Sequence, residues 1–162
     1  MVTKNFASLV TMALTGDNSS LINYDGQTTS VPSTYIVESF KTDLLNKNYS
    51  ELKGVIGAIL ALGSGNTPAA VDDLTLNNVI DDYTVVSQTH TLFSKQISDT
   101  MCVYSRTVKN TSDAPLTISE MGIFIGHNSW QLSAMVARDV LDTPVVLQPG
   151  KKYTFTMTIA LD

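Results

Sequence analysis

The chain has 162 residues, of which 43% are hydrophobic and 15% are charged, and its formal net charge is −5. This length and composition predict one compact globular unit and exclude a disordered chain. The ten Lys and Arg residues are scattered, so the sequence lacks the basic stripe with which proteins bind the phosphates of nucleic acid.

The cysteine content and the apolar runs exclude further classes. Cys102 is the only cysteine, so neither an intramolecular disulfide nor a thiolate metal cluster is expected. The apolar segment from Asn5 to Leu14 has only Lys4 as a nearby positive charge, which does not fit a signal peptide. No run approaches the roughly 20 apolar residues of a membrane span. We therefore expect neither secretion nor a membrane partner.

The first predicted element is a short amphipathic helix over residues 4 to 14. Thr3 precedes it as a candidate N-cap, and Gly16 follows its end. The apolar side chains that recur at helical spacing are Phe6, Leu9, Val10, Ala13 and Leu14. This face has two interpretations: it covers the open end of the following domain, or it docks to another subunit. Residues 16 to 33, rich in Asp, Asn, Ser, Gly and Thr, are expected to form a polar connector.

Strand-type patterns begin after this connector. β-Forming residues gather between positions 35 and 40, although residues 42 to 52 could instead form a turn of helix. Val55 to Leu62 is a nearly continuous apolar run, and Gly63-Ser64-Gly65 closes it. This pattern predicts a strand that is buried on both faces and then a sharp turn.

Three further strands are predicted over residues 83 to 93, 101 to 108 and 116 to 125. One side of the first is expected to carry Val86, Gln88, His90 and Leu92. One face of the second is expected to carry Cys102, Tyr104, Arg106 and Val108. The polar residues 110 to 115, which end in proline, favour a reversal between the second and third strands.

The last predicted strand has the most regular alternation in the chain. Its apolar positions, which alternate with Thr and Ala, are Tyr153, Phe155, Met157 and Ile159. The turn at residues 148 to 151 contains Pro-Gly, so residues 145 to 147 and 153 to 159 are expected to run antiparallel. Together these strands predict an antiparallel β-sandwich or jelly-roll-like domain over residues 31 to 162. Residues 1 to 30 would form an N-terminal helix and connecting arm.

The chain offers little that could carry chemistry. His90 and His127 lie far apart in the sequence without a ligand pattern around them. The acidic pairs Asp72-Asp73 and Asp81-Asp82 should point apart on extended chain rather than bind one ion. The glycine-rich turn after residue 62 lacks the Gly-Lys-Ser/Thr ending of a phosphate-binding loop. We expect no catalytic, metal or cofactor-binding residues, and no enzymatic activity.

Glu120 is the one carboxylate expected to be partly buried, because it lies between Ile118 and Ile123 in an otherwise apolar strand. Its expected role is structural. Either Arg106 or a run of backbone amides would satisfy its charge, whereas a catalytic carboxylate usually needs a second acid within reach.

Two stretches of the sequence resemble structural proteins of tailed bacteriophages. The first, Leu62–Pro68 followed by Asp72–Leu76, is similar to a G-T/S-G-x-T-P … D-x-x-L segment of small virion proteins. The second resembles the C-terminal part of tail, fibre-associated and capsid-decorating proteins, with N-x-S … I-x-E-x-G, A-R and P-G-x-x-Y patterns. It comprises Val108–Ser112, Pro115–Ile123, Met135–Arg138 and Pro144–Phe155.

The resemblance implies a structural component of a tailed-phage virion at the head, collar or tail. Its partners would be copies of itself, as a homo-oligomer, and other virion proteins, with no cofactor. The chain lacks the collagen-like repeats and heptads of a long fibre, which favours a compact adaptor, collar or decorating subunit.

Five residues are the candidates for subunit contacts in this hypothesis. Phe6, Leu9 and Leu14 would dock the arm, and Trp130 and Tyr153 would be interface or core aromatics. The alternative function is a tail-associated module that binds the host surface or a carbohydrate. Its attraction is Trp130, which lies between two polar neighbours, although a glycan site usually combines several exposed aromatic rings.

Overall fold

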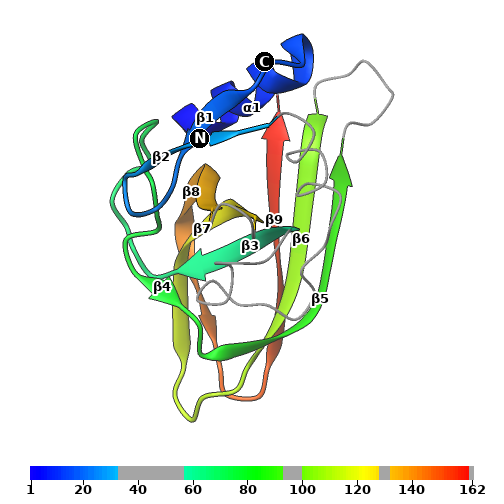
Figure 1. Ribbon diagram of the computed structural model, residues 1–162. Coiled ribbons are helices and arrows are strands. Elements are labelled where there is room, and N and C mark those ends of the chain that lie inside the picture. Colours follow the sequence, from blue (N-terminus) through cyan, green and yellow to red (C-terminus); the bar gives the residue numbers. More distant parts are fainter. Residues whose placement is uncertain (33–56, 93–99, 128–131, 161–162) are drawn as a thin grey trace.

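The computed structural model describes residues 1–32, 57–92, 100–127 and 132–160 (Figure 1). The described residues form one helix and nine strands. In chain order these are α1 (Lys4–Thr15), β1 (Ser19–Ile22), β2 (Thr28–Val31), β3 (Gly57–Gly63), β4 (Val79–Ile80), β5 (Tyr83–Leu92), β6 (Thr100–Asn110), β7 (Leu116–His127), β8 (Leu132–Leu147) and β9 (Lys152–Ala160). The strand expected at residues 35 to 40 and the possible helical turn at 42 to 52 lie outside the described residues.

The strands form two facing antiparallel sheets and a separate hairpin. One sheet has the order β4-β3-β7-β8, the other has the order β5-β6-β9, and β1 pairs with β2. All strand pairs are antiparallel. In Figure 1, α1 and the β1–β2 hairpin lie together at one end of the sheets. The predicted fold class, an antiparallel sandwich-like domain with a short N-terminal helix, is confirmed.

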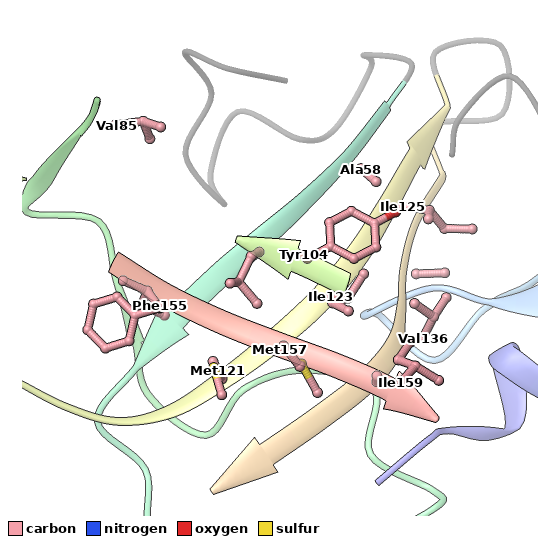
Figure 2. Close-up of a cluster of buried hydrophobic side chains, with 14 of the residues drawn as sticks. Ala58, Val85, Tyr104, Met121, Ile123, Ile125, Val136, Phe155, Met157 and Ile159 are labelled. Atoms are coloured by element: carbon pink, nitrogen blue, oxygen red, sulfur yellow. The ribbon is translucent and has the colours of Figure 1, made fainter. Parts of the chain in front are cut away.

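The main core lies between the two sheets. Figure 2 shows Tyr104, Met157 and Ile159 of the three-stranded sheet among Ile123 and Ile125 of β7. These side chains are at most 4% exposed, and their burial is the main favourable contribution to folding. The apolar face predicted for β9 therefore lies in this core, except for its first residue, Tyr153, which is exposed.

The helix closes one end of this core. It begins at Lys4 as predicted and ends at Thr15, one residue later than predicted. Gly16 follows in the left-handed conformation (φ 72°), and its N–H donates to the Met12 carbonyl oxygen. The Thr3 side chain does not cap the helix but donates to the Met135 carbonyl oxygen at 2.7 Å. Leu9 and Met12 belong to the main core. Two interpretations of the apolar helical face were open, and in this structure the face covers the chain's own core.

Strands β3 and β7 are buried on both faces. Every residue of β3 is buried, which confirms the two-sided burial predicted from its sequence over Gly57–Leu62. The face of the four-stranded sheet that points away from β5-β6-β9 has its own apolar cluster. It consists of Ile59, Ala61, Leu76, Phe124 and Met135. Because Leu76 comes from the segment between β3 and β4, this loop covers the outer face of the sheet.

The polar connector expected at residues 16 to 33 contains the β1–β2 hairpin instead. Each of its strands buries one apolar side chain, Leu21 or Val31, while most neighbouring Ser and Thr residues are exposed. The Asn23 side chain accepts the N–H groups of Asp25 and Gln27, and Gly26 has a φ of 79°. A hairpin with one buried residue per strand has too weak an apolar period to be recognised in a polar sequence.

The face predicted for β5 is wrong at Val86, because the strand contains a β-bulge there. The pairing with β6 shifts between Val85 and Ser87, and the extra residue turns Val86 outward, where it is 46% exposed. Val85 and Gln88 are buried instead. The period of two therefore breaks in the middle of this strand. In β6, three residues that were predicted to share a face, Tyr104, Arg106 and Val108, are all buried.

The predicted pairing of residues 145 to 147 with residues 153 to 159 is wrong, although the turn between them exists. The Lys151 N–H donates to the Gln148 carbonyl oxygen at 3.1 Å, and Gly150 has a φ of 73°. However, β8 pairs with β7 and β9 pairs with β6. The turn carries the chain from one sheet to the other, because each strand takes its partner within its own layer.

Asn110 joins this crossing to the second one, between β6 and β7. Its buried side-chain amide donates to the carbonyl oxygens of Ala114 and Leu147, both at 2.8 Å. Its side-chain oxygen accepts the N–H and the hydroxyl of Ser112, also at 2.8 Å. Its own carbonyl oxygen accepts the Gly150 N–H. One residue therefore fixes two of the connections between the sheets.

Replacing Asn110 with Ala should lower the free energy of unfolding by about 1–3 kcal/mol, because the buried Leu147 carbonyl oxygen loses its side-chain donor and the turn at Ser112 loses its acceptor. Urea unfolding measures this loss. The matched control is Thr111→Ala, which removes an exposed hydroxyl with a single long contact of 3.5 Å and should change stability by less than about 0.5 kcal/mol. Equal losses in the two variants would contradict the role given to Asn110.

Candidate functional site

The most concentrated charge in the described structure is a buried network around Glu120 of β7. Glu120 is 0% exposed and lies on the outer face of the four-stranded sheet. Its Oε1 accepts the N–H groups of Gly65 at 2.9 Å and Asn78 at 3.0 Å, and its Oε2 accepts the N–H of Asn77 at 3.2 Å. The run of backbone amides expected around this carboxylate is present.

The cation that pairs with Glu120 is Arg138 of β8, which is 1% exposed. Its Nε and Nη2 donate to Glu120 Oε2 at 3.0 and 2.8 Å, and its Nη1 donates to Asp73 Oδ2 at 2.8 Å. Nη2 also donates to the Thr67 carbonyl oxygen at 3.0 Å. Arg106, the other partner considered for Glu120, instead donates to the Leu60 carbonyl oxygen at 2.8 Å.

The register of β7 and β8 brings these two side chains together. Arg138 is the partner of Gly122 in the ladder, two residues from Glu120, so the charged side chains are diagonal neighbours on one face. A Cβ at Gly122 would lie 3.0 Å from the Leu76 side chain. A Cβ at Gly65 would lie 2.5 Å from Glu120 Oε1. The absence of a side chain at Gly65 therefore leaves room for the Glu120 carboxylate, and its absence at Gly122 leaves room for Leu76.

The network holds the segment between β3 and β4 on the sheet. Glu120 binds the segment at Gly65 and at Asn77 and Asn78, while Arg138 binds it at Thr67 and Asp73. These contacts lie at both ends and in the middle of the segment. The arrangement therefore fixes the main chain and presents no carboxylate to solvent at Glu120.

The pKa values of both charged groups reflect this pairing. Burial raises the pKa of Glu120, but the amides of Asn78, Asn77 and Gly65 and the Arg138 guanidinium lower it more, and the net pKa lies below its ordinary value. Burial lowers the pKa of Arg138, but its bonds to Asp73 and Glu120 more than reverse this and raise it. Both groups remain charged at neutral pH.

The lowered pKa of Glu120 predicts acid sensitivity. Because the folded chain binds this proton less tightly than the unfolded chain, the contribution of Glu120 is complete above the ordinary glutamate pKa of about 4.3 and is lost as pH falls through the folded value. The stability difference between wild type and Glu120→Gln, measured by urea unfolding, should be largest at neutral pH and shrink in acid. A difference that stays constant with pH would rule out this linkage.

Removing the carboxylate should be costly. Glu120→Ala leaves the Arg138 charge buried with only Asp73 as an acid partner, and the expected loss is about 3–5 kcal/mol in the free energy of unfolding. The control is Asp139→Ala, next to Arg138 in sequence, which removes an exposed carboxylate whose hydrogen bond within the described residues comes from the neighbouring Val140 N–H. Thermal or urea unfolding should find the control within about 0.5 kcal/mol of wild type. A similar loss in both would contradict the network's importance.

A second set of buried polar side chains stabilises the edge of β3 from the opposite sheet. The Gln88 amide donates to the Ala58 carbonyl oxygen at 2.9 Å and accepts the Leu60 N–H at 3.3 Å. The guanidinium of Arg106 lies 5.9 Å from the centre of the Tyr83 ring, and burial raises the pKa of Tyr83 to about 12. These side chains bond to main-chain groups of β3, and Gln88 and Arg106 thereby join the two sheets.

The N-terminal residues bind the edge of β8. Val2 forms a bridge with Ala137, and the Met1 ammonium donates to the Arg138 carbonyl oxygen at 2.7 Å. The Asn5 side chain donates to the carbonyl oxygens of Met135 and Ile22. The start of the predicted arm is thus bonded to the body of the same chain.

Of the five residues predicted for subunit contacts, the structure describes the side chains of Phe6, Leu9 and Tyr153, and these lie in different environments. Phe6 is partly buried and Leu9 is buried, and both pack with the core. Leu14 lies in α1, where its side chain is not described, and Trp130 lies outside the described residues. Tyr153 is 46% exposed, with its ring centre 4.9 Å from that of Phe155.

The other residues considered for chemistry are also separated. His127 lies at the end of β7, paired with Leu132 of β8. Asp72 pairs with Lys4 while Asp73 pairs with Arg138, so these neighbours point apart as predicted. Among the residues that the structure describes, no group of three or more His, Cys, Asp or Glu side chains is placed to hold a metal ion.

The surface along β9 is the best candidate for contacts with another molecule. The exposed face of this strand carries Thr154, Thr156 and Thr158. Two of these hydroxyls pair with β6: Thr156 with Ser105 at 2.9 Å and Thr154 with Thr107 at 2.8 Å. A groove of about 390 Å³ lies between the adjacent edges of β8 and β9. Its lining residues are Met121, Leu141, Asp142, Thr143, Val145, Tyr153, Thr154, Phe155 and Thr156.

No protein-family model, curated protein or solved structure matches this chain. In the described part of the chain, no helix has the length and apolar character to cross a membrane.

The sequence predicted one part of each candidate site, the Glu120 network and the surface along β9. It indicated Glu120 and its backbone amides, but Arg138 was noted only as part of an A-R pattern. It also indicated Tyr153, but not the groove beside it. The available signal for Arg138 was a second charged residue within an apolar strand, since such a charge must be paired when buried.

Proposed function

We propose that the chain is a non-enzymatic structural subunit of a tailed-phage particle, located at the head, collar or tail, and that it assembles with copies of itself and other particle proteins. The observation that carries this proposal is that the two phage-like stretches meet in one structural network. Gly65 and Asp73 of the first stretch contact Glu120 and Arg138 of the second. The residues that carry the resemblance thus act together to hold the fold.

The hydrogen bonds of the buried polar residues support a structural role. Glu120, Arg138, Gln88 and Asn110 are all less than 4% exposed, and each bonds to main-chain groups of a different segment. Such bonds rigidify loops and connections between sheets. A rigid subunit suits assembly, because a symmetric array multiplies contacts that are individually weak.

The direct test is the location of the chain in its source culture. Particles are purified from lysates by density gradient, treated with nuclease, washed in salt and analysed by quantitative mass spectrometry. We expect the chain to remain with the particles in many copies, in constant ratio to the major particle protein across the gradient. An abundant cytosolic enzyme serves as the control for carry-over. Recovery of the chain only in the soluble fraction, together with that enzyme, would overturn the proposal.

A further inference from the structure

We infer that the outer edge of β9 pairs with β9 of a second copy of this chain, antiparallel and about a two-fold axis at Thr156. Two three-stranded sheets would thereby join into one continuous sheet. This inference rests on the proposed function, for which it names one partner and one contact. It is carried by a comparison of the sheet edges, by the groove beside β9 and by the self-complementary sequence of the strand.

The edge of β8 is protected against pairing with another chain. Its first part is covered by the N-terminal residues of the same chain, through the bridge between Val2 and Ala137. Its second part carries two acidic residues, Asp139 and Asp142, and then Pro144, which has no N–H to donate. Charges and proline are the usual features by which proteins block edge-to-edge pairing.

Two other edges, those of β5 and β4, are irregular or short. Strand β5 has the bulge at Val86, and bulges twist an edge away from a flat partner. Strand β4 has only two residues and is followed by Asp81-Asp82. A two-residue edge offers too little main chain for a stable pairing.

The edge of β9 has none of these features between Tyr153 and Ile159. This stretch has no charge, proline or glycine, and its register with β6 is unbroken over Lys152–Ile159. One side of β9 pairs with β6, and no hydrogen bond from another described segment reaches its main chain on the other side. A long and regular edge of this kind is a template for another strand.

The groove beside β9 provides an apolar surface for the second strand. It lies on the open side of β9, where Leu141, Val145 and Tyr153 are partly or fully exposed. Tyr153 is in the inward phase of the strand, yet it is 46% exposed. A strand added at this edge would place its inward side chains over these residues and remove them from water.

The sequence of β9 fits a second copy in this register. With Thr156 on the axis, Thr154 faces the partner's Thr158, Phe155 faces the partner's Met157, and Tyr153 faces the partner's Ile159. Hydroxyl residues then meet on one face and apolar residues on the other. The pairs Ser105–Thr156 and Thr107–Thr154 already form such hydroxyl contacts between β6 and β9, so the dimer would continue the same pattern.

The charges also permit this arrangement. Each copy has a net charge of −5, which opposes association, but the paired stretch is neutral. The lysines at positions 151 and 152 precede this stretch, and the antiparallel arrangement sends the two pairs to opposite ends. In this register Lys152 faces the partner's Ala160, so the two Lys152 positions lie eight residue spacings, or about 27 Å, apart along the strands. This distance is well beyond the Debye length of about 8 Å at physiological salt.

The test compares charge variants at the axis. In the full chain, Thr156→Lys and Thr156→Glu each place like charges opposite one another across the interface, and both should raise the dimer dissociation constant by about tenfold or more. Sedimentation velocity and light scattering over a concentration series measure it. Because Thr156 is exposed, both variants should keep the far-ultraviolet circular dichroism of wild type, and the loss of the exposed Ser105–Thr156 hydroxyl contact should lower the urea midpoint of the monomer only slightly.

Mixing the two variants tests the contact itself. An equimolar mixture should restore a one-to-one heterodimer, because opposite charges then face each other at the axis. The matched control is Thr89→Lys, which adds the same charge at an exposed position of β5, the far edge of the same sheet. This control should dimerise as wild type does.

Three outcomes would overturn the inference: a monomeric wild-type chain at the highest concentrations, dimers that tolerate both Thr156 variants, or equal disruption by Thr89→Lys. The two proposals fail separately. A chain that is present in particles but monomeric in solution overturns the β9 contact alone. A dimer that depends on Thr156, formed by a chain absent from particles, overturns the particle assignment alone.

Discussion

The described fold depends on the burial of one carboxylate on the outer face of a sheet. A buried carboxylate is tolerated only with full hydrogen bonding and an opposite charge, and Glu120 obtains both from the segment between β3 and β4 and from Arg138. The segment is held in place by these bonds, so its Leu76 can cover Phe124 and Met135. As a result, β3 and β7 can be apolar on both faces although the sheet has a sandwich partner on only one side.

Local patterns predicted the elements better than their partners. The apolar run of β3 and the alternation in β9 identified both strands and their buried faces, because these features depend only on neighbouring residues. The turn at residues 148 to 151 has the same chemistry whether its strands pair or separate, and the sequence could not show that β8 and β9 enter different layers. The bulge at Val86 could not be predicted for a related reason, because a bulge is defined by the register of β5 with its partner β6.

The candidate sites were also predictable only in part, from local patterns but not from the pairing of strands. Glu120 was recognisable as a charge in an apolar strand, but Arg138 belongs to the next strand, and the β7–β8 ladder shifts register on both sides of the contact. Counting residues through two bulges cannot identify such a pair. The exposed hydroxyls of β9 were predictable from their period, whereas the position of β9 at the edge follows only from the strand order. The arm residue Leu9 was recognised as part of an apolar face, and the structure decides that this face covers the chain's own core.

The central position of β6 has a consequence for synthesis. Its two neighbours are β5, which precedes it, and β9, which follows only after β7 and β8. During translation, β6 can pair with β5 at once, but its second edge stays unpaired while about 40 more residues emerge from the ribosome, a delay of seconds at ordinary elongation rates. The sandwich therefore forms late, and a partly made chain exposes a strand edge that the finished chain conceals. Such a chain depends on rapid completion or on chaperones to avoid pairing with other nascent chains.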